Sequence, residues 1–112
     1  MIFKDSAHKK KYEKLLSQMN SNDNYHTPLA YLLALDDNLT HERIRKCFDF
    51  DKDCIHSDVL EEAWITGTNR RTLKLAFNLF NDNNSCNVSD ICGCSFTAFY
   101  LQAIALHCNI SL

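Results

Sequence analysis

The spacing of apolar and polar positions predicts helices along most of this chain. A first helix is expected over residues 6–19, with Ser6 as its N-cap and an apolar stripe on one face. The stripe consists of Tyr12, Leu15, Leu16 and Met19. Thr27 and Pro28, a capping residue followed by proline, predict the start of a second helix. Because residues 29–35 are apolar on nearly every side, we expect this second helix to be buried.

Shorter elements are predicted in the middle of the chain. Thr40 should cap a third helix. The acidic stretch 49–56 is expected to be irregular, with a brief extended segment. A fourth helix should begin at Ser57 or Asp58, and Gly67 should end it in the left-handed conformation.

Two longer helices are predicted in the second half of the chain. Residues 69–81 carry leucine, alanine and phenylalanine at helical spacing, and residues 82–94 are expected to be irregular. Ser95 should cap a final helix that reaches Cys108 and has no charged side chain. A helix that is apolar on all sides is expected to be the central core helix, or half core and half interface.

The amino-acid composition supports a helical fold, and the net charge disfavours some classes of function. Two glycines and one proline are too few for a sheet-rich fold, and 46% of the residues are hydrophobic. We therefore predict an all-α fold, a compact single-domain bundle of five or six short helices over residues 1–112, with an apolar C-terminal helix. The formal net charge of −2 disfavours a general nucleic-acid or acidic-membrane binder. Without an evident signal peptide or membrane span, we expect a cytoplasmic protein that does not associate with membranes.

Six cysteines are many for 112 residues. In the cytoplasm we expect them to be reduced and mostly structural. Four of them raise the question of metal binding or oxidation, which the sequence leaves open: Cys86, Cys92, Cys94 and Cys108. Their spacing does not match the usual ligand sets for zinc.

An acidic motif resembles the beginning of a calcium loop. Asp49, Asp51 and Asp53 alternate as in such loops, but the later glycine and glutamate of the template are absent. His107 and Cys108 are neighbours and would point about 100° apart on a helix, so they do not form a nucleophile–base pair. We therefore expect no metal, no cofactor and no enzymatic activity, with a metal- or thiol-dependent activity as the third-ranked alternative.

The function favoured by the sequence is protein binding through the final helix. The partner would be another protein or a second copy of this chain, bound by surface complementarity. The predicted interface residues are Phe96, Phe99, Tyr100, Ala103 and Ile104.

The alternative function is nucleic-acid association through basic residues of the first and fifth helices. These residues would form one basic face if the two helices lay side by side. They are Lys9, Lys10, Lys11, Lys14, Arg70, Arg71 and Lys74.

Short motifs also give the chain a family resemblance. Residues 60–64 form a Leu-Glu-Glu-x-Trp turn, residues 75–79 read Leu-Ala-Phe-Asn-Leu, and the opening helix contains HKKKYEKLL. Together these motifs resemble a family of short helical proteins of unknown function from Gram-positive gut bacteria and their mobile elements. The resemblance implies an accessory role, and it brings no activity, cofactor or catalytic residue. We expect Asn78, amid apolar neighbours in the second motif, to be hydrogen-bonded within the domain rather than to a partner.

Overall fold

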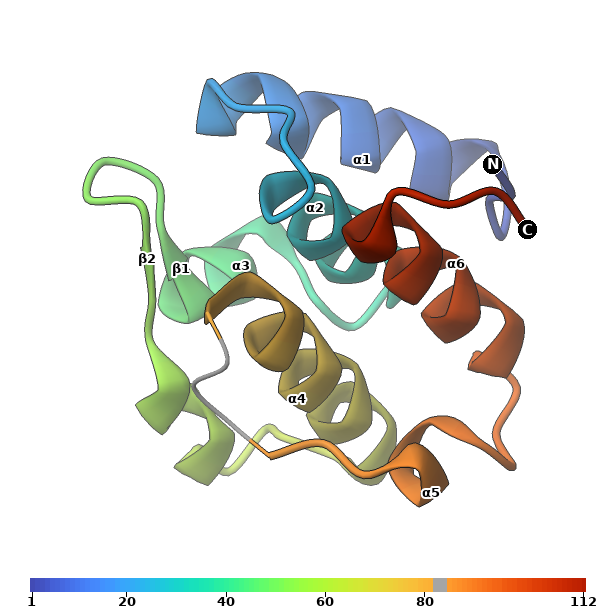
Figure 1. Cartoon of the computed structure of the whole chain (residues 1–112). Coiled ribbons are helices and arrows are strands. Elements are labelled where there is room, and N and C mark those ends of the chain that lie inside the picture. Colours follow the sequence, from blue (N-terminus) through green and yellow to red (C-terminus); the bar gives the residue numbers. More distant parts are fainter. Residues whose placement is uncertain (82–84) are drawn as a thin grey trace.

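A computed structural model describes residues 1–81 and 85–112 of the chain. Figure 1 shows a mostly helical globule with one small two-stranded sheet, in agreement with the predicted helical fold class. Its elements are α1 (Ser6–Met19), α2 (His26–Leu35), α3 (His41–Cys47), β1 (Phe48–Asp49), β2 (Cys54–Ile55), the 3-10 helix η1 (Ser57–Glu61), α4 (Gly67–Asn81), α5 (Val88–Ile91) and α6 (Thr97–Cys108).

The centre of the fold is α2, which packs against α1, α4 and α6 (Figure 1). Every residue of this helix except Thr27 is buried, and Leu29, Leu32 and Leu33 have no exposed surface. The prediction of a buried second helix is therefore confirmed. A helix without a polar face can only be stable when other elements cover all of it, which explains this position.

The helix α1 has the predicted bounds but a different cap. Asp5 is the N-cap, and its carboxylate accepts a hydrogen bond of 2.8 Å from the backbone N–H of His8. Ser6, expected as the cap, is the first helical residue. Asn20 ends the helix in the left-handed conformation, with φ of 56°.

The middle of the chain forms α3 and a β-hairpin. The Thr40 hydroxyl caps α3 by accepting a hydrogen bond from the backbone N–H of Arg43, as predicted. The strands β1 and β2 pair in antiparallel register, with Phe48 opposite Ile55. The expected extended segment within residues 49–56 is thus one half of a hairpin. The 3-10 helix η1 follows it.

The prediction for Gly67 is wrong, because this residue begins α4 instead of ending the preceding helix. Thr66 and Asn69 form a reciprocal cap at that point. The Asn69 side-chain oxygen accepts a hydrogen bond of 2.5 Å from the Thr66 backbone N–H, and the Thr66 hydroxyl accepts one from the Asn69 N–H. The chain therefore enters a helix at Gly67, which has no positive φ.

The segment expected to be irregular contains the short helix α5. The side chain of Asp90 accepts a hydrogen bond of 2.9 Å from the backbone N–H of Asn87, forming a capping box. Residues 82–84 of the same segment lie outside the described residues. The expected cap of the last helix, Ser95, is replaced by Phe96, and α6 begins at Thr97.

Within residues 1–81 and 85–112, no helix is long and apolar enough to cross a membrane.

Candidate functional site

The helix α6 has a buried face and an outer face. Tyr100, Gln102, Ala103 and Ala105 are buried against the rest of the domain. On the outer face, Ala98 and Leu101 are exposed and Ile104 is half-buried. These three residues are spaced three apart, so they lie along one stripe of the helix.

The structure divides the five predicted interface residues into two groups. Tyr100 and Ala103 have no exposed surface, so a partner cannot reach them in this conformation. Phe96, Phe99 and Ile104 are half-buried. Of these five, Ile104 lies on the outer stripe.

Phe96 and Phe99 hold the beginning of α6 against the N-terminal segment. The Phe96 ring lies edge-on to Tyr100, and the Lys4 ammonium lies 5.7 Å from the centre of the same ring. Phe99 contacts His8 of α1 edge-on, with ring centres 6.2 Å apart. Both phenylalanines therefore pack within the domain, which explains their partial burial.

A residue that the sequence analysis missed is Leu101, whose side chain is 45% exposed. The sequence places Leu101 three residues after Ala98 and three before Ile104, a spacing that puts the three side chains on one face of the helix. This spacing was not decisive, because apolar residues surround this helix on every side and several faces could equally have been outermost.

An apolar groove of about 190 Å³ lies beside this stripe, between α4, α5 and α6. Its walls include Leu75 and Leu79 from α4, Ile91 from α5 and Ile104 from α6. Val88, at the start of α5, lines the same groove and is 75% exposed. We call this groove and the stripe Ala98–Leu101–Ile104 the α6 surface.

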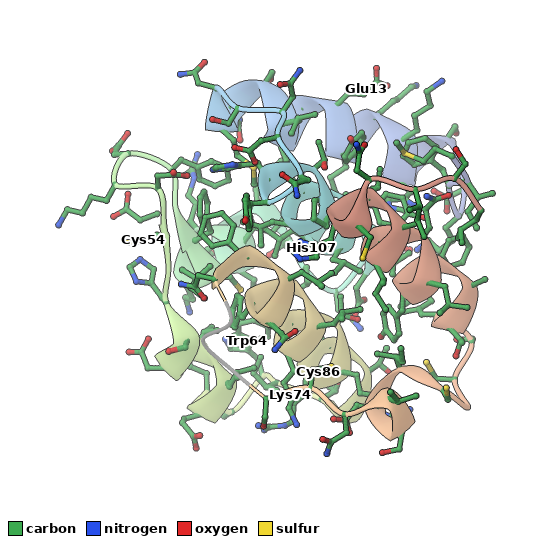
Figure 2. The ribbon with its side chains drawn as sticks, viewed as in Figure 1. Glu13, Cys54, Trp64, Lys74, Cys86 and His107 are labelled. Carbon is green, nitrogen blue, oxygen red and sulfur yellow. The ribbon has the colours of Figure 1, made fainter. Side chains whose placement is uncertain are left out.

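The edge of the α6 surface is polar. The ammonium of Lys74 lies 3.7 Å from the carboxylate of Asp90. Figure 2 labels Lys74 on α4 and Cys86 shortly before α5, and the charge of Lys74 acts on the Cys86 thiol. Asn78 is half-buried in the groove wall and is engaged in an interaction of its own. An apolar centre with a polar edge is the usual anatomy of a protein interface.

The predicted basic face is not assembled in the structure. Its residues lie on α1 and α4, and α2 runs between these two helices (Figure 1). The Lys11 ammonium donates a hydrogen bond to the backbone carbonyl of Leu39, and Lys74 pairs with Asp90. Lys9, Lys10, Lys14, Arg70 and Arg71 are exposed.

The three aspartates of the calcium-like motif make other contacts. The Asp49 carboxylate accepts hydrogen bonds of 2.9 Å from the backbone N–H groups of Asp51 and Lys52, within the turn of the hairpin. Asp53 binds His26 instead of facing the other two. In the described part of the chain, no group of three or more metal-binding side chains is present.

His26 lies between two carboxylates from distant segments. Its Nδ1 is 2.8 Å from Asp23 and its Nε2 is 2.6 Å from Asp53. Burial alone would lower the pKa of His26, but the hydrogen bonds to Asp53 and Asp23 outweigh burial and raise it. The contacts of both ring nitrogens with carboxylates favour the charged imidazolium form, and they link the hairpin turn to the start of α2.

All six cysteines are free thiols, and their environments differ. Burial raises the pKa of Cys47 to about 12, which makes this thiol inert. Burial, with the charge of Asp90, also raises the pKa of Cys86. Burial alone would raise the pKa of Cys94 as well, but hydrogen bonds to its sulfur and the charge of Arg71 outweigh burial and lower it.

No curated protein and no solved structure matches the chain. A family model does match, over residues 1–110, and it therefore covers nearly the whole chain. Its description confirms the expectation of a family of unknown function. The chain belongs to the family of unknown function DUF6075.

Proposed function

We propose that this protein is a non-enzymatic accessory domain that binds another protein through the α6 surface. The observation that carries the proposal is the exposure of Leu101 and Val88 beside an apolar groove. Exposed apolar side chains that gather next to a groove are typical of a site that a partner covers.

The chemistry of the partner follows from the charge of this surface. From Ile91 to Leu112 the sequence contains no aspartate, glutamate, lysine or arginine. A partner that buried charged side chains here would leave them without counter-charges, at a high desolvation cost. The partner's contact surface is therefore uncharged and apolar in this proposal. The same surface on a second copy satisfies that condition, so self-association is included.

The rest of the expected biology belongs to the same proposal. The free thiols support a reducing, cytoplasmic location. An adaptor or inhibitor encoded by a mobile element of a Gram-positive bacterium would fit a small domain with one binding surface. Nucleic-acid association is less favoured, because α2 separates the two basic helices.

Site-specific photo-crosslinking in cells tests the binding surface. The photoreactive residue p-benzoylphenylalanine is placed at Ala98, which is exposed one turn from Leu101 and leaves that leucine in place. We expect a discrete crosslinked product, containing either a second copy or another protein. A second variant, Leu101→Glu, introduces a charge at the centre of the surface and should abolish that product.

The matched control places the same photoreactive residue at Lys52. This residue is exposed in the hairpin turn, on the side of the molecule away from α6 (Figure 1). The proposal is wrong if position 98 crosslinks no more than position 52, or if Leu101→Glu leaves the product unchanged while circular dichroism shows a folded domain.

A further inference from the structure

The linker between α5 and α6 carries two thiols that differ in exposure. Cys92 follows α5 and is exposed, whereas Cys94 is half-buried just before α6. Gly93 between them has a φ of +76°, a conformation that favours glycine. The pair is therefore held in a turn, with one sulfur open to solvent and the other partly sheltered by the domain.

The turn allows the two sulfurs to be joined. Consecutive Cα atoms are about 3.8 Å apart, so an extended three-residue segment spans about 7 Å between its outer Cα atoms. A disulfide requires about 4.4–6.8 Å between the same atoms. The bend at Gly93 shortens the span towards that range, and an added Cβ at this glycine would meet no atom within 4 Å. Glycine is thus required here by its backbone conformation and not by crowding.

Polar groups from two helices surround the sulfur of Cys94. The Thr97 hydroxyl lies 3.7 Å from the sulfur and donates a hydrogen bond of 2.9 Å to the backbone carbonyl of Cys94. The positive charge of Arg71, from α4, acts on the same sulfur. A partly exposed thiol beside a cation is the environment of reactive cysteines, because the positive charge stabilises the thiolate.

Buried polar groups lie in the core near Cys94. The Tyr100 hydroxyl donates a hydrogen bond of 2.7 Å to the Thr72 hydroxyl, which in turn donates to the backbone carbonyl of Thr68. Burial above all, with the nearby Cys94 and Asp36, raises the pKa of Tyr100 to about 12, so this phenol remains a donor. Asp36 is 5% exposed, and its Oδ2 has no hydrogen-bond partner among the described residues.

We propose that Cys92 and Cys94 form a redox-active dithiol that exchanges with external disulfides, with Cys94 as the nucleophile and Cys92 as the resolving thiol. Arg71 is a positioning residue whose positive charge stabilises the Cys94 thiolate. This inference is independent of the α6 surface.

Thiol–disulfide exchange at this pair would proceed in two steps. The Cys94 thiolate attacks one sulfur of a disulfide R–S–S–R, an S–S bond forms between Cys94 and that sulfur, and the other R–S⁻ leaves and takes a proton from water. Cys92 then loses its proton and attacks the Cys94 sulfur, which forms the Cys92–Cys94 disulfide and releases the second R–S⁻. Two protein thiols are oxidised to one disulfide, and R–S–S–R is reduced to two R–SH.

The first test compares thiol reactivities in the full-length, reduced protein. Cys108, at the other end of α6, is exposed, so accessibility alone predicts that it reacts faster than the half-buried Cys94. We expect the reverse: alkylation by iodoacetamide at pH 7, followed by peptide mass spectrometry, should be about tenfold faster at Cys94. Equal or slower alkylation of Cys94 would overturn the proposal.

The second test follows the products of exchange. With oxidised glutathione, the wild-type protein should become two hydrogens lighter, and its disulfide should map to Cys92 and Cys94. Cys92→Ser should instead accumulate one glutathione on Cys94, because the resolving thiol is missing. A disulfide between Cys94 and Cys86, or glutathione captured first by Cys108, would show that the assignment is wrong. A parallel reaction with a disulfide-linked peptide distinguishes a protein source of the disulfide from a small-molecule source by their relative rates.

The role of Arg71 is tested by a pH profile that a purely structural role would not change. Arg71→Leu should move the pH dependence of Cys94 alkylation to higher pH and slow the reaction at pH 7 by about three- to tenfold. Arg70→Leu removes the neighbouring exposed charge and is the matched control. If both variants keep the wild-type profile, Arg71 does not stabilise the thiolate.

Discussion

Two buried histidines have hydrogen-bond partners that favour opposite charge states. His26 donates from both ring nitrogens to carboxylates, which requires the charged form. His8 accepts a hydrogen bond at Nδ1 from the Lys4 backbone N–H and donates from Nε2 to the Tyr31 carbonyl. That pattern requires the neutral form, and burial lowers the pKa of His8 accordingly.

The raised pKa of His26 makes the stability of the domain depend on pH. Its ordinary pKa is 6.5, so the ion pairs with Asp23 and Asp53 contribute fully below about pH 6.5 and are lost as pH rises through the raised folded-state pKa. We expect His26→Gln to lower the free energy of unfolding by about 1 kcal/mol at pH 6, with a smaller loss at alkaline pH. Urea unfolding of both proteins across this range measures the difference. A difference that stays constant with pH would contradict the assignment.

The lowered pKa of His8 has the opposite consequence. Below about pH 6.5 the unfolded chain protonates this histidine while the folded domain resists protonation, so stability falls as the solution becomes acidic. We expect ¹⁵N-resolved NMR of the histidine rings at pH 6.5 to show His26 as imidazolium and His8 as the neutral Nε2–H tautomer. Asp53→Asn removes one carboxylate and should reduce the protonation of His26 without changing His8.

At the scale of elements, the two glycines of the chain have opposite conformational roles. Gly67 begins α4, has no positive φ, and leaves open space for a Cβ. Gly67→Ala should therefore raise the free energy of unfolding by about 0.5 kcal/mol, because alanine loses less backbone entropy on folding. Gly93→Ala should lower it by about 1 kcal/mol, since φ of +76° strains alanine. Urea unfolding of both variants measures these changes in the free energy of unfolding. A loss of stability in Gly67→Ala would contradict the assignment of Gly67 to the first turn of α4.

Helices whose signals are local could be predicted from the sequence. The stripe of α1, the continuous apolar run of α2 and the Thr40 cap of α3 each depend on residues within one or two turns. The start of α4 could not, because Asn69 reaches back to Thr66 in a cap without the usual glutamate or glutamine. Gly67 consequently has the sequence context of a helix end although it begins one.

The candidate site was predictable only in part, for a physical reason that applies to α6. Tyr100 and Leu101 are adjacent and both apolar, yet one has no exposed surface and the other is 45% exposed. Only tertiary packing against α2 and α4 decides which side faces inward. The polar surroundings of Cys94 likewise depend on Arg71, which lies 23 positions earlier on another helix.

At the scale of the whole molecule, the stability of the domain depends on the burial of α2 more than on any polar cluster. Leu33 has no exposed surface in the helix that α1, α4 and α6 all contact. Leu33→Ala should lower the free energy of unfolding by about 3 kcal/mol, because it leaves a cavity at the centre of the fold. Leu101→Ala, on the outer stripe, should cost about 0.5 kcal/mol or less. Chemical unfolding monitored through Trp64 fluorescence measures the free energy of unfolding of both variants. Equal losses of stability would contradict the central position of α2.

The two ends of the chain lie next to each other (Figure 1). The backbone N–H of Ile2 donates a hydrogen bond of 3.1 Å to Gln102, and Ile2 lines a common groove with Ile110 and Leu112. Residues 1 and 112 could therefore be joined without disturbing the packing of the helices. A circular permutant with residues 112 and 1 joined by a short glycine–serine linker, and new ends opened at Lys52, should keep the same helices in a different order along the chain.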